Sequence, residues 1–221
     1  MPEVDSLQPL GDQAVLAAFA DENAALGWAA GVKRLAPSWL FDVVQAYTTV
    51  AVYFDLNCTN YRAASDWLRR EVRELAHEAI DSRLHSIPCC YEMQLDLERV
   101  ARHTGLGHDE IIRLHTSTEF TVYAIGFCPG FPYLGYLPEL LSSVPRLESP
   151  RLRVDPGSVG LTGRQTGIYT EARPGGWNLI GRTPLQLVDV ADGYFPLRTG
   201  DRVRFESIDV ATFRELEGRR L

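Results

Sequence analysis

The chain has 221 residues, enough for one large domain or two small ones with a buried core. Hydrophobic residues make up 45% and charged residues 23%, as in ordinary globular proteins. The net charge of -7 argues against nucleic acid as a partner, because binding to phosphates needs a basic patch. Four cysteines without a CxxC pair favour a reduced, cytoplasmic protein, and no apolar run is long enough to predict a membrane span.

The first part of the chain predicts a small α/β domain. Apolar periodicity predicts these elements in order: strand 14–19, helix 23–35 ended by Pro37, strand 40–46 and strand 48–54. Asn60 is expected to cap a second helix. The apolar residues of that helix recur at steps of three and four: Trp67, Leu68, Val72, Leu75 and Ala79. A strand at 84–90 would complete a β-α-β-β-α-β order, which is typical of a ferredoxin-like, split-βαβ domain over residues 1–87.

From Pro88 the chain changes character, and we place a second domain over residues 88–221. Two short helices come first, 96–103 closed by Gly105 and then 109–115. After them, 12 of the 18 glycines fall between residues 126 and 200. Short strand-like pieces alternate with these glycines at 120–125, 159–161, 167–170, 177–180, 185–190 and 202–205. Many short strands separated by turns indicate a closed or nearly closed β-barrel.

Residues 126–182 combine glycine, proline, aromatic residues and arginine without a helical or strand period. Glycine permits positive φ and close approach to the backbone, whereas proline fixes φ. A loop of such fixed shape loses less entropy when it binds a ligand. We therefore expect Phe127, Phe131, Tyr133 and Trp177 to contact substrate or a partner. The alternative is that these aromatic residues fill the barrel core.

A polar set in the same stretch suits a small planar or anionic group. Guanidinium groups hold carboxylates and carbonyls in two-point geometry, and a glycine-rich backbone offers N–H donors. The set consists of Arg151, Arg164, Gln165, Thr166, Gly167, Tyr169, Asn178 and Arg182. We predict that Arg164 and Arg182 are catalytic; the alternative is surface arginines in exposed ion pairs. His115, at the end of a helix, is the third catalytic candidate, against a purely local role.

Several familiar catalytic signatures do not fit the chain. Residues 157–167 resemble a phosphate loop but lack the GK[ST] ending, so we expect no ATP hydrolysis by this chain alone. Ser158 lies in PGSVG rather than GxSxG, and Cys128 is more simply a small buried residue. The histidines between 103 and 115 lack the spacing of metal ligands. No metal site is predicted.

Long motifs run along the whole chain: GDQA, IPCCYE, YAIGFCPGFPYLGYLP, PRLRV, GSVG, RQTGIY, PGGWNLIGRTP and GDRVRF. In these motifs the chain resembles the KipI/PxpB family, also called allophanate hydrolase subunit 1. The resemblance implies an α+β fold with an N-terminal α/β domain and a C-terminal cyclophilin-like β-barrel. Where the family has V-P-A-G-S-V, this chain places Asp155 before Pro156, which changes the shape and charge of that loop.

The resemblance also implies a function. Members of the family act as one subunit of ATP-dependent 5-oxoprolinase, which opens 5-oxo-L-proline to L-glutamate. The implied partners are a KipA/PxpC-type subunit (allophanate hydrolase subunit 2) and a PxpA-type subunit; this chain alone is expected to be inactive and to bind no cofactor, with ATP and magnesium used by the assembled complex. Two alternatives are an inhibitor of a sensor histidine kinase and a subunit of a urea- or allophanate-processing enzyme. Prolyl isomerase activity is not expected, because a fold does not carry a function.

Overall fold

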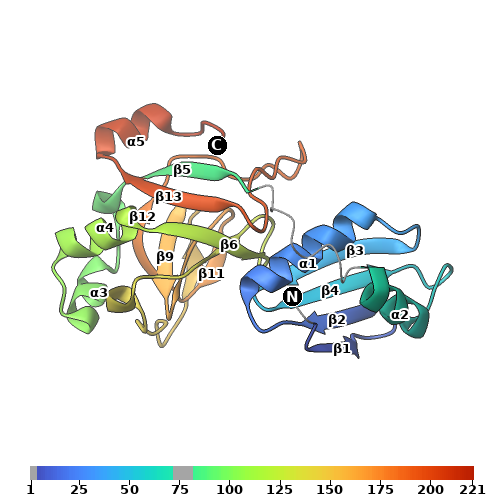
Figure 1. Ribbon diagram of the computed structural model, residues 1–221. Helices are drawn as coiled ribbons and strands as arrows, with labels where there is room; N and C mark the ends of the chain where they lie inside the picture. Colours follow the sequence, from blue (N-terminus) through green and yellow to red (C-terminus); the bar gives the residue numbers. More distant parts are fainter. Residues whose placement is uncertain (1–3, 72–81) are drawn as a thin grey trace. The chain divides into compact units, whose positions relative to one another are not determined.

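The computed structural model describes residues 4–71 and 82–221. The chain divides into two compact units, Met1–Asp81 and Ser82–Leu221, each with its own hydrophobic core (Figure 1). The division falls ahead of the expected boundary between residues 87 and 88. Three of the apolar positions expected in the second helix, Val72, Leu75 and Ala79, lie outside the described residues. None of the helices in the described part is long and apolar enough to cross a membrane.

The first unit is an antiparallel sheet covered by two helices on one face (Figure 1). Its elements are β1 (Ser6–Pro9), β2 (Ala14–Ala18), α1 (Glu22–Leu35), β3 (Leu40–Ala46), β4 (Thr49–Phe54) and α2 (Tyr61–Glu71). The strands pair in the order β1-β2-β4-β3, each pair antiparallel. β2 and β3 therefore run parallel on either side of β4 and are joined by α1, which is a split-βαβ connection.

Local sequence signals account for these elements. The Asp21 side chain accepts a hydrogen bond from the Ala24 N–H at 2.8 Å and so begins α1. The Asn60 side chain accepts from the Ala63 N–H at 3.1 Å, which confirms the expected cap of the second helix. The core between the helices and the sheet consists of Val15, Ala17, Phe19, Ala25, Trp28, Ala29, Val32, Val43, Val50, Val52, Phe54, Ala64 and Leu68.

The expected last strand of this unit belongs elsewhere. β5 (Leu84–Cys89) pairs in parallel with β13 (Arg202–Ser207) of the second unit. Ile87 and Cys89 on β5 are fully buried, and both belong to the hydrophobic core of the second unit. The apolar face of β5 therefore packs in that core. The sheet edge beside β2 is filled instead by β1, a strand that the sequence analysis missed. The ferredoxin-like order that used 84–90 as its last strand was therefore wrong.

The second unit is built on a barrel of seven strands in the described part of the chain. In spatial order they are β5, β13, β6 (Glu119–Ile125), β7 (Pro132–Gly135), β10 (Gln165–Ile168), β9 (Ser158–Thr162) and β12 (Asn178–Arg182). Cys90, directly after β5, closes the ladder onto Arg182 at the end of β12. Its N–H donates to the Arg182 carbonyl at 2.8 Å, and the Arg182 N–H donates back at 3.0 Å. Closure pairs both edge strands of the sheet.

Helices and a short ribbon surround this barrel. They are α3 (Leu97–Thr104), α4 (His108–Ser117), α5 (Val210–Leu216) and the pair β8 (Arg151–Val154) with β11 (Arg173–Gly175). α4 packs on β13 and α3 on β12. Gly105 ends α3 with φ of 75° and donates its N–H to the Ala101 carbonyl at 2.8 Å, as the sequence predicted. The left-handed backbone at this position favours glycine.

Two stretches differ from their predicted structure. The segment 185–190 forms no strand: it makes single bridges from Gln186 to Arg220 and from Asp189 to Tyr194. Residues 132–135, which the sequence analysis treated as loop, form β7 between β6 and β10. Its proline and glycine lie at the two ends of the strand, where they do not interrupt the ladder.

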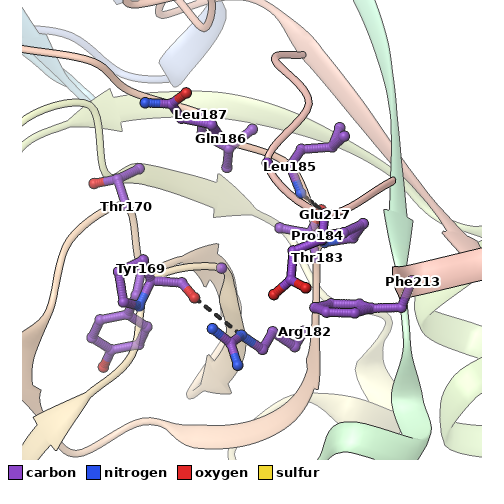
Figure 2. A pocket seen from close by; sticks show the side chains of 13 residues that line it. Tyr169, Thr170, Arg182, Thr183, Pro184, Leu185, Gln186, Leu187, Phe213 and Glu217 are labelled. Atoms are coloured by element: carbon purple, nitrogen blue, oxygen red, sulfur yellow. Dashed lines mark hydrogen bonds between the residues drawn. The ribbon is translucent and has the colours of Figure 1, made fainter. Parts of the chain in front are cut away.

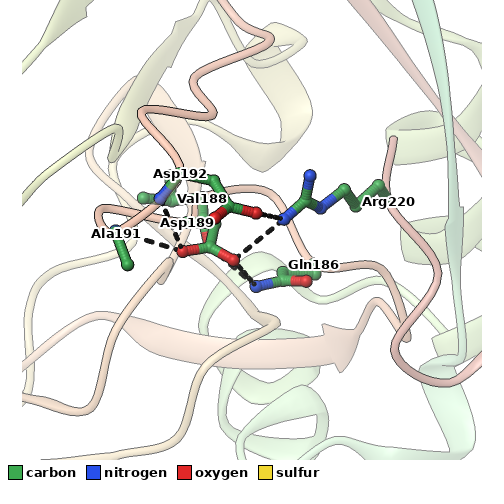
Figure 3. Close-up of polar contacts among 6 residues, drawn as sticks. All are labelled: Gln186, Val188, Asp189, Ala191, Asp192 and Arg220. Carbon is green, nitrogen blue, oxygen red and sulfur yellow. Dashed lines mark hydrogen bonds and ion pairs between the residues drawn. The ribbon is translucent and has the colours of Figure 1, made fainter.

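The C-terminal residues are held against the segment 184–194 (Figure 3). The Arg219 carbonyl accepts from the Gln186 N–H at 2.8 Å. The Arg220 guanidinium pairs with Asp189 at 2.9 Å and also with Asp192. We call this set of contacts, which includes the Tyr194 hydroxyl donating to the Leu221 carbonyl, the C-terminal latch.

Replacing Arg220 by alanine is expected to loosen the latch without unfolding the barrel. Both ion pairs of Arg220 are exposed, so we expect a small effect on global stability. The Gln186 N–H donates to the Arg219 carbonyl, and the Tyr194 N–H donates to the carbonyl of Asp189, a partner of Arg220. Amide hydrogen exchange should become faster at both residues and stay unchanged on β9. Arg202→Gln, which removes an exposed ion pair to Glu119, is the matched control. Unchanged amide exchange at Gln186 and Tyr194 in Arg220→Ala would show that the Arg220 ion pairs do not hold this segment.

Candidate functional site

Aromatic side chains from the glycine- and proline-rich stretch surround a cavity of about 290 Å³, which we call the aromatic pocket. They come from the loop after β6, from β7, from the end of β10 and from the start of β12. The lining consists of Phe127, Phe131, Tyr133, Arg146, Pro150, Tyr169, Pro174, Gly175, Gly176 and Trp177. The four aromatic residues singled out from the sequence as contacts therefore all lie on one cavity.

Phe131 organises the rings of this pocket. Its centroid lies 5.0 Å from Tyr133, 5.3 Å from Tyr169 and 5.6 Å from Trp177, all in edge-to-face arrangements. Phe131 is 2% exposed, whereas Phe127 is 58% exposed. Phe131 and Trp177 thus belong to a buried cluster, as the core interpretation expected. Phe127 lies at the exposed rim, and its contact with substrate or a partner stays a prediction.

Two glycines allow the rings to pack against the backbone. A Cβ at Gly167 would lie 3.0 Å from ring atoms of both Phe131 and Trp177 and 2.9 Å from a backbone oxygen. A Cβ at Gly175 would collide with the phenol of Tyr169. Gly167, predicted as a contact residue, therefore serves the site by leaving room for its walls.

The polar groups of the aromatic pocket are the Arg146 guanidinium and the tyrosine hydroxyls. Burial raises the pKa of the Tyr133 and Tyr169 phenols, and the charge of Arg146 lowers both pKa values in part. The phenols therefore stay protonated at neutral pH and can donate hydrogen bonds. Sequence analysis missed Arg146, because it lies outside the long motifs.

A second cavity, of about 190 Å³, lies around Arg182 at the end of β12 (Figure 2). The Arg182 Nε–H donates to the Pro156 carbonyl at 3.2 Å, and its guanidinium lies 5.9 Å from the ring centroid of Phe213. In the view of Figure 2, the Arg182 side chain lies between Phe213 and Tyr169. Arg182 lies on a concave surface, as its predicted role requires. Tyr169 lines both cavities.

Arg164 does not share this site. It is exposed at the turn between β9 and β10, where its guanidinium stacks 4.1 Å above the ring centroid of Tyr136. Arg182 is level with Ser158 at the start of β9, whereas Arg164 follows the end of that strand. The two arginines are thus separated by about the length of the strand, roughly 15 Å. Gln165, next to Arg164, lines neither cavity.

Arg151 is used within the fold. Its guanidinium pairs with the Asp96 carboxylate at 2.7 Å, and the side chains are 26% and 8% exposed. The second Asp96 oxygen accepts from the Leu179 N–H at 2.7 Å. The pair ties β8 to the start of α3 and to β12. Asn178 is also structural: it is fully buried and donates to the Leu161 carbonyl on β9 and to the Pro145 carbonyl in the connection between β7 and β8.

His115 is buried in the barrel core rather than at a surface. The Tyr91 hydroxyl lies 2.6 Å from Nδ1, and Nε2 lies 3.0 Å from the Thr166 hydroxyl. Thr166 donates to the Gly160 carbonyl at 3.0 Å, so its oxygen accepts from Nε2–H and Nδ1 accepts from Tyr91. Burial lowers the pKa of His115 to about 3. His115 and Thr166 are thus fully buried and link α4 to β10, and neither lines the aromatic pocket or the Arg182 cavity, in contrast to the position expected of site residues.

A metal site and a cysteine nucleophile at Cys128 place different requirements on the described residues. Among residues 4–71 and 82–221, no group of three His, Cys, Asp or Glu side chains is placed to hold a metal. The Cys128 thiol is buried 3.4 Å from the Thr170 hydroxyl, which itself donates to the Pro129 carbonyl at 2.7 Å. Cys128 therefore packs as a small core residue.

The family described as carboxyltransferase domain, subdomain C and D, matches residues 6–195, and the chain belongs to it. The chain is 35% identical to the B subunit of 5-oxoprolinase from Bacillus subtilis (strain 168) over 222 residues, which cover 91% of this chain and 92% of that protein. The family expected from the motifs is thereby confirmed.

Solved structures agree with this assignment. TTHA0988 has a TM-score of 0.79 and 32% identity, and the match covers 90% of this chain and 40% of that one, so this chain spans less than half of its length. Urea carboxylase of Kluyveromyces lactis has a TM-score of 0.71 over 97% of this chain and 22% of that one. At 18% identity, the second match shows a likeness of fold alone, here a mixed α/β fold with a large antiparallel sheet.

Proposed function

We propose that the chain is the B subunit of a 5-oxoprolinase and opens 5-oxo-L-proline to L-glutamate together with PxpA- and PxpC-type subunits. Similarity along nearly the whole chain to a protein named as the B subunit of this enzyme carries the proposal. The same family supports a cytoplasmic protein with a cyclophilin-like barrel as its second domain. ATP with magnesium belongs to the assembled complex, because this chain lacks a GK[ST] phosphate loop.

The Arg182 cavity suits one step of this reaction. Opening an amide at the expense of ATP proceeds most simply by phosphoryl transfer to the carbonyl oxygen, and the transferred phosphoryl group carries negative charge. The Arg182 Nε–H donates to the Pro156 carbonyl, and no hydrogen bond joins its two terminal nitrogens to another described residue, so they are available to stabilise that charge. Arg164, on its exposed turn, is better placed for contact with a partner protein of the complex.

Reconstitution with both partner subunits tests the proposal. We expect ATP hydrolysis that depends on 5-oxoproline and on all three subunits. Arg182→Gln should lower kcat by about 100-fold while the complex still assembles, because the barrel seam at this position uses only the Arg182 backbone. Arg202→Gln breaks an exposed ion pair with Glu119. Because Arg202 lines neither cavity, this variant should retain activity. A complete complex without 5-oxoproline-dependent ATP hydrolysis would refute the function.

The exposed Phe127 side chain keeps a second candidate function open, binding to a sensor histidine kinase. The two functions differ in what they need. A kinase inhibitor would act as a single chain on a kinase, whereas a component of 5-oxoprolinase needs its partner subunits and a small substrate. The third candidate function is that of a subunit of a urea- or allophanate-processing enzyme. Assays of the same reconstituted complex with urea and with allophanate test it.

A further inference from the structure

We propose, on the basis of the proposed function, that the aromatic pocket is the binding site for 5-oxo-L-proline. In this arrangement Arg146 holds the substrate carboxylate, and the Tyr133 hydroxyl donates to the lactam carbonyl. The substrate belongs to a narrow chemical class: a small, nearly planar ring with one amide and one carboxylate. The walls, the charge and the unused donors of the pocket each match one part of that class.

The walls match the ring. Phe131 and Trp177 form an apolar base, and Phe127 stands at the exposed rim. Gly175 and Gly176 line the pocket with backbone rather than with side chains. A cavity of about 290 Å³ is near the lower end of small-molecule sites, which suits a metabolite of this size.

The charge matches the carboxylate. Arg146 is the charged side chain of the lining, and no carboxylate lines the pocket. In the described part of the chain, no carboxylate or carbonyl accepts a hydrogen bond from its guanidinium, although its own carbonyl accepts from Arg99. The neighbouring Arg151 is already paired with Asp96. The pocket is therefore locally positive in a protein whose net charge is -7.

An unused donor matches the amide. The Tyr133 hydroxyl makes no hydrogen bond to any other described residue, and it lies close enough to Arg146 for that charge to lower its pKa. A phenol that stays protonated donates to a carbonyl oxygen without losing an existing bond. Tyr133 and Arg146 together thus offer two separate polar contacts to one bound ring.

Calorimetric titration of the isolated full chain tests this site with three ligands: L-5-oxoproline, L-proline and pyrrolidinone, the same lactam without the carboxylate. We expect Arg146→Gln to weaken 5-oxoproline binding by about 10- to 100-fold, as expected for loss of a charge-assisted contact. Pyrrolidinone should bind R146Q and the unaltered chain equally. Tyr133→Phe keeps the ring and should weaken both lactams, whereas R202Q, at a residue that does not line the pocket, should bind all three ligands as the unaltered chain does.

The outcomes separate this inference from the proposed function. Failure of the isolated chain to bind 5-oxoproline, or equal binding by R146Q, would overturn the pocket assignment even if the reconstituted complex is active. An inactive complex would overturn the function and leave the binding result standing. In an active complex, R146Q should raise KM at least tenfold with little change in kcat, as expected for a residue that positions the substrate.

Discussion

Acidification from pH 6.5 towards pH 3 is expected to destabilise the second unit by up to about 5 kcal/mol through His115 alone. Burial lowers the pKa of this imidazole from 6.5 to about 3 in the folded chain. Between pH 6.5 and pH 3, the imidazole binds a proton in the unfolded chain but not in the folded chain, so acidification favours the unfolded state. The stability that the neutral imidazole provides is complete above pH 6.5 and is lost as the pH falls towards 3.

His115→Gln isolates this effect. A glutamine side chain can accept from Tyr91 and donate to Thr166, and it does not titrate in this range. Urea unfolding at pH 7 and at pH 5 measures the free energy of unfolding. The unaltered chain should lose about 2 kcal/mol more than H115Q between these two pH values. Parallel pH dependences in the two proteins would contradict this expectation, because they would mean that His115 binds its proton at the same pH in the folded and in the unfolded chain.

Loss of the Asp96 carboxylate should cost about 3 kcal/mol of unfolding free energy. Asp96→Ala removes the partner of the largely buried Arg151 guanidinium and leaves the Leu179 N–H without an acceptor. One Arg151 nitrogen is already buried without a partner, so the group has no alternative bond nearby. A buried charge and a buried donor are then both left unsatisfied.

A double-variant cycle tests this explanation. Arg151→Met should be strongly destabilising in the unaltered chain and much less so in D96A, because the second change removes a charge that has already lost its partner. Asp155→Ala breaks the exposed pair with Arg153, whose side chains are 70% and 55% exposed for Arg153 and Asp155, and should cost at most about 1 kcal/mol. Equal costs for D96A and D155A would contradict a specific role for the buried pair.

Local patterns predicted most of the elements, because caps, periodicity and turn residues act over a few positions. Asn60 caps the start of α2, and Gly105 ends α3, as expected. The strand at 84–89 was recognised, but its partner was not, because pairing with β13 depends on residues more than 100 positions away. Register between distant strands is set by which apolar faces meet in three dimensions.

The same limit explains the outcome for the site. The aromatic set was predicted because its glycines and prolines signal close backbone approach. Arg164 and Arg182 looked equivalent in sequence, yet the strand register places them at opposite ends of β9. His115 was a catalytic candidate because of its residue type and its position at the end of a helix. The packing of Phe120 and Phe205 against its ring, which the sequence does not reveal, shows that it belongs to the core.

The parallel pairing of β5 with β13 also governs when the barrel forms. Among the described strands, β5 pairs with β13, and Cys90 directly after it bridges to Arg182 at the end of β12. β5 therefore stays unpaired until the chain beyond residue 180 has been made. Contacts of such sequence separation are slow to form because the loop entropy is lost before they stabilise the fold. During synthesis, the second unit is therefore completed only when its last strand has been made, whereas the whole first unit precedes residue 82. We expect the first unit to fold early on the ribosome and the barrel to fold only after β13 has emerged.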